Sequence, residues 1–268
     1  MCAVYIPTLS RYSSLEKIVP AWLEQDVPVI LMVDPSELKE HIRFRDSKGW
    51  RIYVDIARVP RNGMGIGYKR KHCVMHAYDM GYDSFIMSDD DHKPRADSDV
   101  QLLLDEAEKP GVLGIGAVVQ IYARFTGGAI NGLSGPILWP GGAGFSVYGL
   151  NVETAIACGN FDPKLHSFGE DAELRRQGLT RGIPWRVHAD VWCDAVNQRN
   201  SPGGFMAKYD GDLAARQAAE TACRELIYER WPQWVSSPDK PPRMAWQAML
   251  EHYVPNWREM SALHGGTL

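Results

Sequence analysis

An unbroken run of five apolar residues, Val29–Val33, most constrains how this chain can fold. A strand that is covered on both faces reads as such a continuous run, whereas a strand with one face in solvent alternates apolar and polar residues. Shorter strand-like runs lie at 3–6 and 84–87, and helical stretches at 14–25 and 68–80 separate the three runs. This alternation predicts βαβ units that build a mostly parallel sheet.

The rest of the chain predicts more strands and then a helical end. Residues 51–54 are a weaker candidate for a fourth strand, and 110–149 is rich in glycine, as expected of short strands and active-site loops. Further elements are expected as helices at 152–158 and 171–179, a strand at 185–191, and tryptophan-bearing helical segments at 210–230 and 242–264. We therefore expect a main domain at 1–200 and a helical C-terminal extension at 201–268 packed on it.

Composition excludes several classes of protein. The chain has 268 residues, of which 45% are hydrophobic and 23% charged, as in ordinary globular domains. It lacks an apolar stretch of roughly 18 residues and an N-terminal secretory pattern, so we expect a cytoplasmic protein without a membrane partner. Five scattered cysteines without a C-x-x-C pair encode neither a disulfide framework nor a structural zinc site. The net charge of −4 argues against nonspecific coating of nucleic acid but leaves room for a local basic face.

Three consecutive aspartates, Asp89, Asp90 and Asp91, follow the run at 84–87. Open α/β sheets place their ligands at the carboxyl ends of strands, and adjacent carboxylates favour a bound cation. If the extended chain continues, Asp89 and Asp91 share one strand face and can hold a hard divalent ion together with diphosphate oxygens. Oxygen ligands favour Mg²⁺ or Mn²⁺. The alternative is a polar turn that caps a helix or faces solvent.

Four more landmarks accompany this triplet. With it, they are, in chain order, Pro7-Thr8 through Arg11 after the first strand, Asp34 after the second, the helix entry from Asn62-Gly63 through Gly67 to Arg70, the triplet, and Gly169-Glu170-Asp171. This order resembles the GT-A glycosyltransferases, especially those of the family 2 type. The resemblance covers residues 3 to 195 and implies an α/β fold with a GT-A type, Rossmann-like mixed sheet flanked by helices.

The resemblance also implies the activity and its site. A Mn²⁺- or Mg²⁺-dependent enzyme would move a sugar from a nucleotide-sugar donor, expected to be a UDP-sugar, to a hydroxyl. Asp89 and Asp91 would hold the metal, with a third ligand for which His188, Asp190 and Asp194 compete and His188 is favoured. His92 would line the donor site or merely pair with the acids. The donor-binding residues would be Pro7, Thr8, Arg11, Asp34, Gly67, Arg70, Asp89, Asp90 and Gly142, the last in a loop that is equally compatible with a tight turn.

Chemistry assigns roles to the acids near residue 170. Negative charge grows on the departing diphosphate, and a divalent metal stabilises that charge where it develops. The acceptor hydroxyl needs a carboxylate base in an inverting enzyme, for which Asp171 is the candidate and Glu170 its catalytic neighbour. In a retaining enzyme, Asp171 would only orient a substrate. Alternatively, these acids simply favour a helix N-terminus through the helix dipole.

The acceptor is suggested by a narrower likeness. A compact GT-A chain with a short tryptophan-bearing tail is most similar to the bacteriophage TET-associated glycosyltransferases, which act on 5-hydroxymethylcytosine in phage DNA. This likeness implies a DNA partner, the cytoplasm of an infected host cell as location, and no obligate protein partner. The target base would be extruded from the duplex. Candidate phosphate contacts are Arg58, Arg61, Lys69, Arg70, Lys71, Arg175, Arg176, Arg181 and Arg186.

Other functions remain as alternatives. A glycan or a small molecule could be the acceptor. The glycines at 63, 65 and 67 superficially resemble a dinucleotide fingerprint of an oxidoreductase, but the third falls one position early and they do not follow the first strand. A nucleotidyltransferase also uses paired aspartates and metals. A noncatalytic module that binds nucleotide-sugars or DNA would have no use for the base Asp171.

Overall fold

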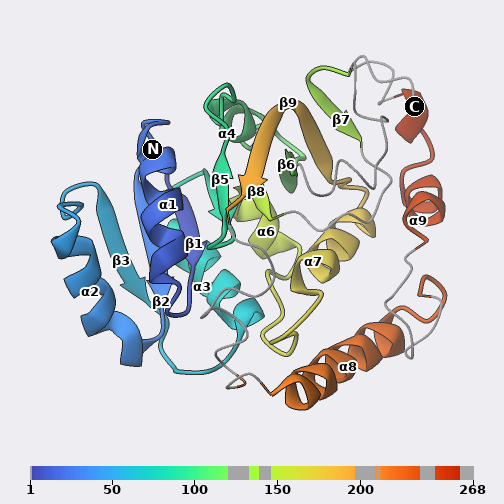
Figure 1. The fold of residues 1–268 in the computed structure, drawn as a ribbon. Coiled ribbons are helices and arrows are strands. Elements are labelled where there is room, and N and C mark those ends of the chain that lie inside the picture. Colours follow the sequence, from blue (N-terminus) through green and yellow to red (C-terminus); the bar gives the residue numbers. More distant parts are fainter. Residues whose placement is uncertain are drawn as a thin grey trace.

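The computed structural model describes residues 2–119, 133–138, 146–196, 209, 212–235 and 245–259. Nine strands of these residues form one sheet, flanked by helices (Figure 1). The strands are β1 (Val4–Pro7), β2 (Val29–Val33), β3 (Val54–Arg58), β4 (Ser84–Ser88), β5 (His92–Pro94), β6 (Gly114–Val119), β7 (Pro136–Leu138), β8 (Val147–Asn151) and β9 (Arg186–Ala195). The helices are α1 (Tyr12–Leu23), the 3₁₀ turn η1 (Pro35–Glu37), α2 (Leu38–Ser47), α3 (Ile66–Asp79), α4 (Gln101–Ala107), α6 (Val152–Ala157), α7 (Glu170–Leu179), α8 (Leu213–Arg230) and α9 (Trp246–Tyr253).

The strand order fixes where a ligand binds. The sheet runs β3-β2-β1-β4-β8-β6-β9-β5, and β7 pairs with β9. The first four strands of this order are parallel, and β8 continues the sheet antiparallel to β4. The chain goes outward from β1 to β3 and then returns to place β4 on the other side of β1. The carboxyl ends of β1 and β4 therefore lie side by side at a topological switch point, where open α/β sheets bind their ligands.

Alternate residues of the central strands build two cores. Tyr5 faces the side covered by α3 and α6, whereas Val4 and Ile6 face the side covered by α1 and α4. Every residue of β2 and β4 is buried, as expected of strands enclosed on both faces. The packing of α3 against the sheet brings its first turn to the carboxyl end of β1, and this places its basic residues beside the aspartates.

The mixed sheet predicted from the sequence is confirmed, and most predicted elements lie within a few residues of their expected bounds. The fourth strand is an exception, because β3 begins only at Val54 rather than at residue 51. Ile52 and Tyr53 are β-prone but lie in an exposed turn, so propensity alone misplaced this strand.

The last two helices pack against α7 and its neighbours. Ile227 of α8 packs beside Gly169 in a small cluster around Leu165, and Trp246 of α9 packs with Leu179 in another. Figure 1 shows α8 below α7 and α9 beside it. The expected boundary near residue 200 lies outside the described residues, so the division into two domains stays a prediction. Among the described residues, none of the helices has the length and apolar composition needed to cross a membrane.

Candidate active site at the switch point

A tight turn carries the aspartate triplet. Strand β4 ends at Ser88, Asp90 and Asp91 form the turn, and His92 begins β5. The extended chain therefore does not continue through the triplet, and the prediction that Asp89 and Asp91 share a strand face is wrong. The turn nevertheless brings their carboxylates together with the His92 ring. We call residues 89–92 the acidic turn.

Arg11 and Thr8 hold the second half of this turn. Thr8 Oγ1 donates a hydrogen bond to Asp90 Oδ2 at 2.9 Å. Arg11 Nη1 reaches both Asp90 Oδ1 (2.9 Å) and Asp91 Oδ2 (2.8 Å). Burial raises the pKa of Asp90 to about 6 although Arg11 lowers it. Burial would also raise the pKa of Asp91, but the hydrogen bond and charge of His92, together with Arg11, lower it below its usual range.

Arg70 joins the acidic turn to α7. Its guanidinium lies 2.5 Å from Asp89 Oδ1 and 2.5 Å from Glu170 Oε1. Only 5% of the Arg70 side chain is exposed, so it forms a buried bridge between two elements that are 81 residues apart. Burial raises the pKa of Glu170 to about 7, although the Arg70 charge acts in the opposite direction.

Lys69 forms a second buried bridge. Its Nζ donates to the carbonyl oxygen of Thr8 at 2.6 Å and lies 3.4 Å from Asp34 Oδ1. Asp34 Oδ2 accepts a hydrogen bond from the Gly63 amide at 3.2 Å, which ties the end of β2 to the entry of α3. Sequence reasoning missed Glu37, whose carboxylate lies 3.9 Å from Lys69 and accepts a hydrogen bond from Ser10. The only signal for Glu37 was its place three residues after Asp34.

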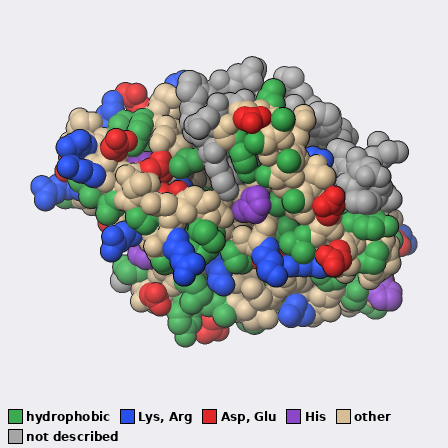
Figure 2. Space-filling model, turned by 90° about the horizontal axis from the view of Figure 1, so that it is seen from below, with side chains coloured by type: hydrophobic (Ala, Val, Ile, Leu, Met, Phe, Trp, Pro, Cys, Tyr) green, Lys and Arg blue, Asp and Glu red, His purple; other side chains and the backbone are tan. Residues whose placement is uncertain are grey.

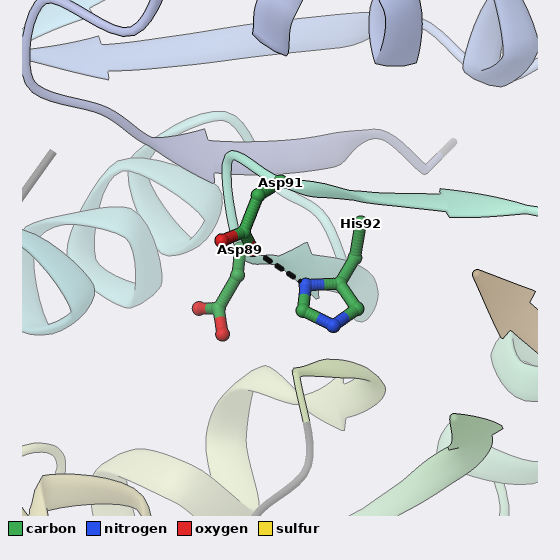
Figure 3. Close-up of side chains that lie close together, drawn as sticks. All are labelled: Asp89, Asp91 and His92. Carbon is green, nitrogen blue, oxygen red and sulfur yellow. Dashed lines mark hydrogen bonds and ion pairs between the residues drawn. The ribbon is translucent and has the colours of Figure 1, made fainter. Parts of the chain in front are cut away.

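His92 completes a group of three potential metal ligands. Atoms of Asp89, Asp91 and His92 all lie within 4.8 Å of one another. Figure 3 shows the three side chains projecting to one side of the turn, with His92 Nδ1 bonded to Asp91 at 2.6 Å. When Nδ1 donates this bond, the neutral ring carries its lone pair on Nε2, and this buried atom has no hydrogen-bond partner. Two carboxylates and an open imidazole nitrogen fit a divalent metal.

The structure places the other histidine and its competitors elsewhere. His188 lies on β9 opposite Ala117, and its Nδ1 is 3.8 Å from Asp190 Oδ2. It is not part of the group formed by Asp89, Asp91 and His92. Asp190 accepts hydrogen bonds from Ser134 and Gly135 just before β7, and the backbone of Asp194 lies opposite Lys93 in the pairing of β9 with β5.

Asp171 differs from Glu170 in exposure. Both begin α7, but Glu170 is buried whereas Asp171 is half-buried, with Oδ1 accepting the Ala172 amide at 2.7 Å. Gly169 precedes them in the left-handed region with φ 79°, where a β-carbon would lie 2.6 Å from Ile227 Cδ1. Gly169 is the N-cap residue of α7, and its lack of a side chain also permits close packing against α8.

The remaining predicted donor-binding residues lie in different parts of the chain, and one of them is outside the described residues. Pro7 is the buried last residue of β1 and pairs with Met32 of β2. Gly67 packs against a loop, because a β-carbon there would lie 2.5 Å from the carbonyl oxygen of Asp162. Gly142 lies outside the described residues.

Comparisons with known proteins identify the fold. No family model matches this chain, and no curated protein matches its sequence. The mannosyltransferase PcManGT from Pyrobaculum calidifontis, solved with GDP-Man and Mn²⁺, is similar with a TM-score of 0.59 and 15% identity over 100% of this chain and 76% of that one. GalNAc-T7, solved with UDP, GalNAc and Mn²⁺, gives 0.57 and 15% over 98% of this chain, which spans 56% of GalNAc-T7. Both have the GT-A fold, and the GT-A fold predicted for this chain is thereby confirmed.

Proposed function

We propose that this chain is a metal-dependent glycosyltransferase that transfers a sugar from a UDP-sugar to 5-hydroxymethylcytosine in phage DNA. One observation carries the transferase proposal: the acidic turn groups two carboxylates and an open imidazole nitrogen at the switch point of a GT-A fold. The two structures of similar fold contain Mn²⁺ together with a nucleotide-sugar in one case, and with a nucleotide and a sugar in the other. These contents support the proposal.

The acidic turn is suited to bind the donor through a metal. Asp89, Asp91 and His92 would be the protein ligands, so His92 takes the place for which the sequence favoured His188. A bound Mn²⁺ or Mg²⁺ would supply a positive charge against the departing diphosphate. Arg11 and Arg70 hold the carboxylates in fixed orientations. This arrangement prepares the site before the donor arrives, which is the condition for electrostatic stabilisation of a transition state.

Asp34 is suited to recognise the nucleoside. It is buried at the end of β2, and its Oδ1 has no hydrogen-bond partner although Lys69 Nζ lies 3.4 Å away. A buried carboxylate oxygen of this kind is an acceptor for a ribose hydroxyl or a uracil N–H. Lys69 also connects Asp34 to the end of β1, because its Nζ donates to the carbonyl oxygen of Thr8.

Asp171 is suited to be the base. It is the more exposed of the two acids that begin α7, so it can accept the proton of an incoming hydroxyl. Glu170 is buried against Arg70 and instead positions the guanidinium that holds Asp89. Under this proposal, Asp171 keeps the role of base that the sequence suggested, and Glu170 acts by positioning Arg70.

The first experiment identifies the acceptor. Duplex DNA containing cytosine or 5-hydroxymethylcytosine is incubated with the protein, Mn²⁺ and a panel of UDP-sugars, digested to nucleosides and analysed by mass spectrometry. A sugar increment on 5-hydroxymethylcytosine alone supports the whole proposal. Slow Mn²⁺-dependent UDP release without an increment keeps the transferase and moves the acceptor to a glycan or small molecule. If no donor gives either a sugar increment or UDP release, the proposal that this chain is a glycosyltransferase is overturned.

A pair of variants tests the assigned roles. Asp91→Ala is expected to abolish metal-dependent donor binding, because it removes a carboxylate from the acidic turn. Asp171→Asn is expected to bind the donor normally and to lose transfer by a factor on the order of 10² or more, as for removal of a general base. Donor binding is measured by titration calorimetry and transfer by product formation. Equal loss of donor binding in both variants would contradict the roles.

A further inference from the structure

A cleft lies away from the acidic turn. It has a volume of about 450 Å³ and is formed by α3, α7, the loop before α7 and the end of α8. Clefts of roughly 300–1,000 Å³ are of the size that binds small molecules or single units of a polymer. Its lining includes Lys71, Gln177, Thr180, Arg181, Arg230 and Trp231, and it includes no residue of the acidic turn. We call it the α7–α8 cleft.

Its carboxylates are already neutralised. Asp162 Oδ2 lies 2.6 Å from Arg230 Nη2. Glu173 is buried and accepts hydrogen bonds from Arg176, Arg230 and the indole nitrogen of Trp231, at 2.9, 3.2 and 2.9 Å. Two carboxylates thus receive two guanidinium groups and an indole N–H, so little of their negative charge remains for a ligand cation.

Two cations of the cleft are left without a carboxylate. Among the described residues, Lys71 and Arg181 form no ion pair, and Arg181 Nη1 donates only to the carbonyl oxygen of Gln177 at 2.8 Å. Lys71 is half-buried and Arg181 is exposed. Their charges therefore favour an anion in the cleft.

The basic residues that the sequence suggested as phosphate contacts differ in their burial. Four of them are buried in the protein, namely Lys69, Arg70, Arg175 and Arg176. Lys71 and Arg181 are the members of that set that line the cleft. On the face of the molecule that carries α8, Lys and Arg side chains form a row (Figure 2), as a surface that follows a polyanion would require.

The cleft also offers a flat ring and neutral polar groups. Trp231 lines the cleft, its indole nitrogen is bonded to Glu173, and it also packs against the cluster around Leu165 and Ile227. Gln177 of α7 and Thr180, the residue after this helix, also line the cleft and carry an amide and a hydroxyl. An aromatic surface beside uncompensated cations is the combination that binds a base and its phosphate in a single strand.

We propose that the α7–α8 cleft binds one nucleotide of a single DNA strand, its phosphate at Lys71 and Arg181 and its base against Trp231. The proposal rests on the proposed function in one respect, since it takes DNA as the acceptor. Helix α7 connects the two sites, with Asp171 at its start and Gln177 six residues later. Six residues span about 9 Å of helix, which is roughly three stacked nucleotides at 3.4 Å each. The cleft would thus hold a strand that flanks the reacting base.

The test measures binding without any transfer. A fluorescein-labelled oligothymidylate of ten nucleotides is titrated with the protein, without donor or metal, and its anisotropy is recorded at several salt concentrations. Lys71→Gln and Arg181→Gln are each expected to weaken binding at least fivefold and to lower the magnitude of the salt slope by about 0.7. Lys39→Gln, an equal charge change on the exposed side of α2, is the matched control and is expected to bind as the unmodified chain does.

The outcomes separate this proposal from the proposed function. Weaker binding in both cleft variants, with unchanged Mn²⁺-dependent UDP release from the donor, supports the cleft as a strand site. Absence of oligonucleotide binding, or equal binding by the cleft variants and the control, overturns it. Thymidine monophosphate binding as tightly as the decamer also overturns it, because the cleft would then be a site for free nucleotide. Absence of UDP release by the unmodified chain with every donor would refute the transferase, while oligonucleotide binding that depends on Lys71 and Arg181 would still identify the cleft as a strand site.

Discussion

Arg70 and Lys71 are neighbours in α3, yet they belong to two regions of opposite design. Arg70 is buried and bonded to Asp89 and Glu170, in a site where each carboxylate of the triplet has a cationic partner. Lys71 lines an open cleft and forms no ion pair among the described residues. In the acidic turn, Arg11 and Arg70 pair with all three carboxylates, whereas in the α7–α8 cleft Lys71 and Arg181 have no carboxylate partner among the described residues. Neighbouring cations in one helix turn can therefore differ completely in what they do.

The largest expected effect breaks the buried bridge. Arg70→Gln leaves Glu170 buried without its charged partner. Above pH 7, where Glu170 is ionised, removal of one member of a buried pair costs about 3–5 kcal/mol of the free energy of unfolding. Lys71→Gln is the matched control, with an expected change within about 0.5 kcal/mol because it leaves no group unpaired. Urea unfolding monitored by circular dichroism measures both. Similar costs for the two variants would mean that the contrast between the two regions does not exist.

The next prediction concerns the contact between the start of α3 and the loop at 162–166. Gly65 has φ 88°, and a β-carbon there would lie 2.2 Å from the carbonyl oxygen of His166. Gly65→Ala is therefore expected to cost about 3 kcal/mol in unfolding free energy, through backbone strain and overpacking together. Gly63 also has a positive φ, of 67°, but a β-carbon there meets nothing within 4 Å.

Gly63→Ala is the control for the strain alone, with an expected cost of about 1 kcal/mol. Thermal and urea unfolding of both variants give the difference. If the two substitutions cost the same, the close approach of α3 to the loop at 162–166 does not contribute to stability, and the two regions are less firmly joined than the contacts imply.

The sequence predicted the central strands well because their environment is simple. Strands β2 and β4 are buried on both faces, and continuous apolar runs encode that state directly. Strand β3 alternates between buried and exposed residues, and the exposed Ile52 and Tyr53 beside it have the stronger β propensity, so its position was missed. Helices α2 and α4 were also missed.

The sequence identified the acidic residues of the candidate site, but it did not reveal which residues pair with them. The triplet after a buried strand indicated a ligand site, but the turn at Asp90 and Asp91 and the partner of each oxygen depend on contacts across 80 residues or so. The proposed third metal ligand shows this most clearly. His188 was favoured from its place after a strand, whereas the turn presents His92, which the sequence could equally read as merely paired. No local pattern reveals that its Nε2 is buried and open.

The smallest expected effect is a change in how stability depends on pH. Burial raises the pKa of Glu170 from 4.5 to about 7, so between these values the folded chain holds a proton that the unfolded chain has released. Stability contributed by this group is present at low pH and is lost as the pH rises through about 7. Glu170→Gln removes the titration and is expected to flatten the fall in unfolding free energy from pH 5 to 7. Glu251→Gln, on the exposed side of α9, controls for loss of a carboxylate. Parallel curves for the unmodified chain and Glu170→Gln would show that Glu170 stays ionised beside Arg70 throughout this pH range.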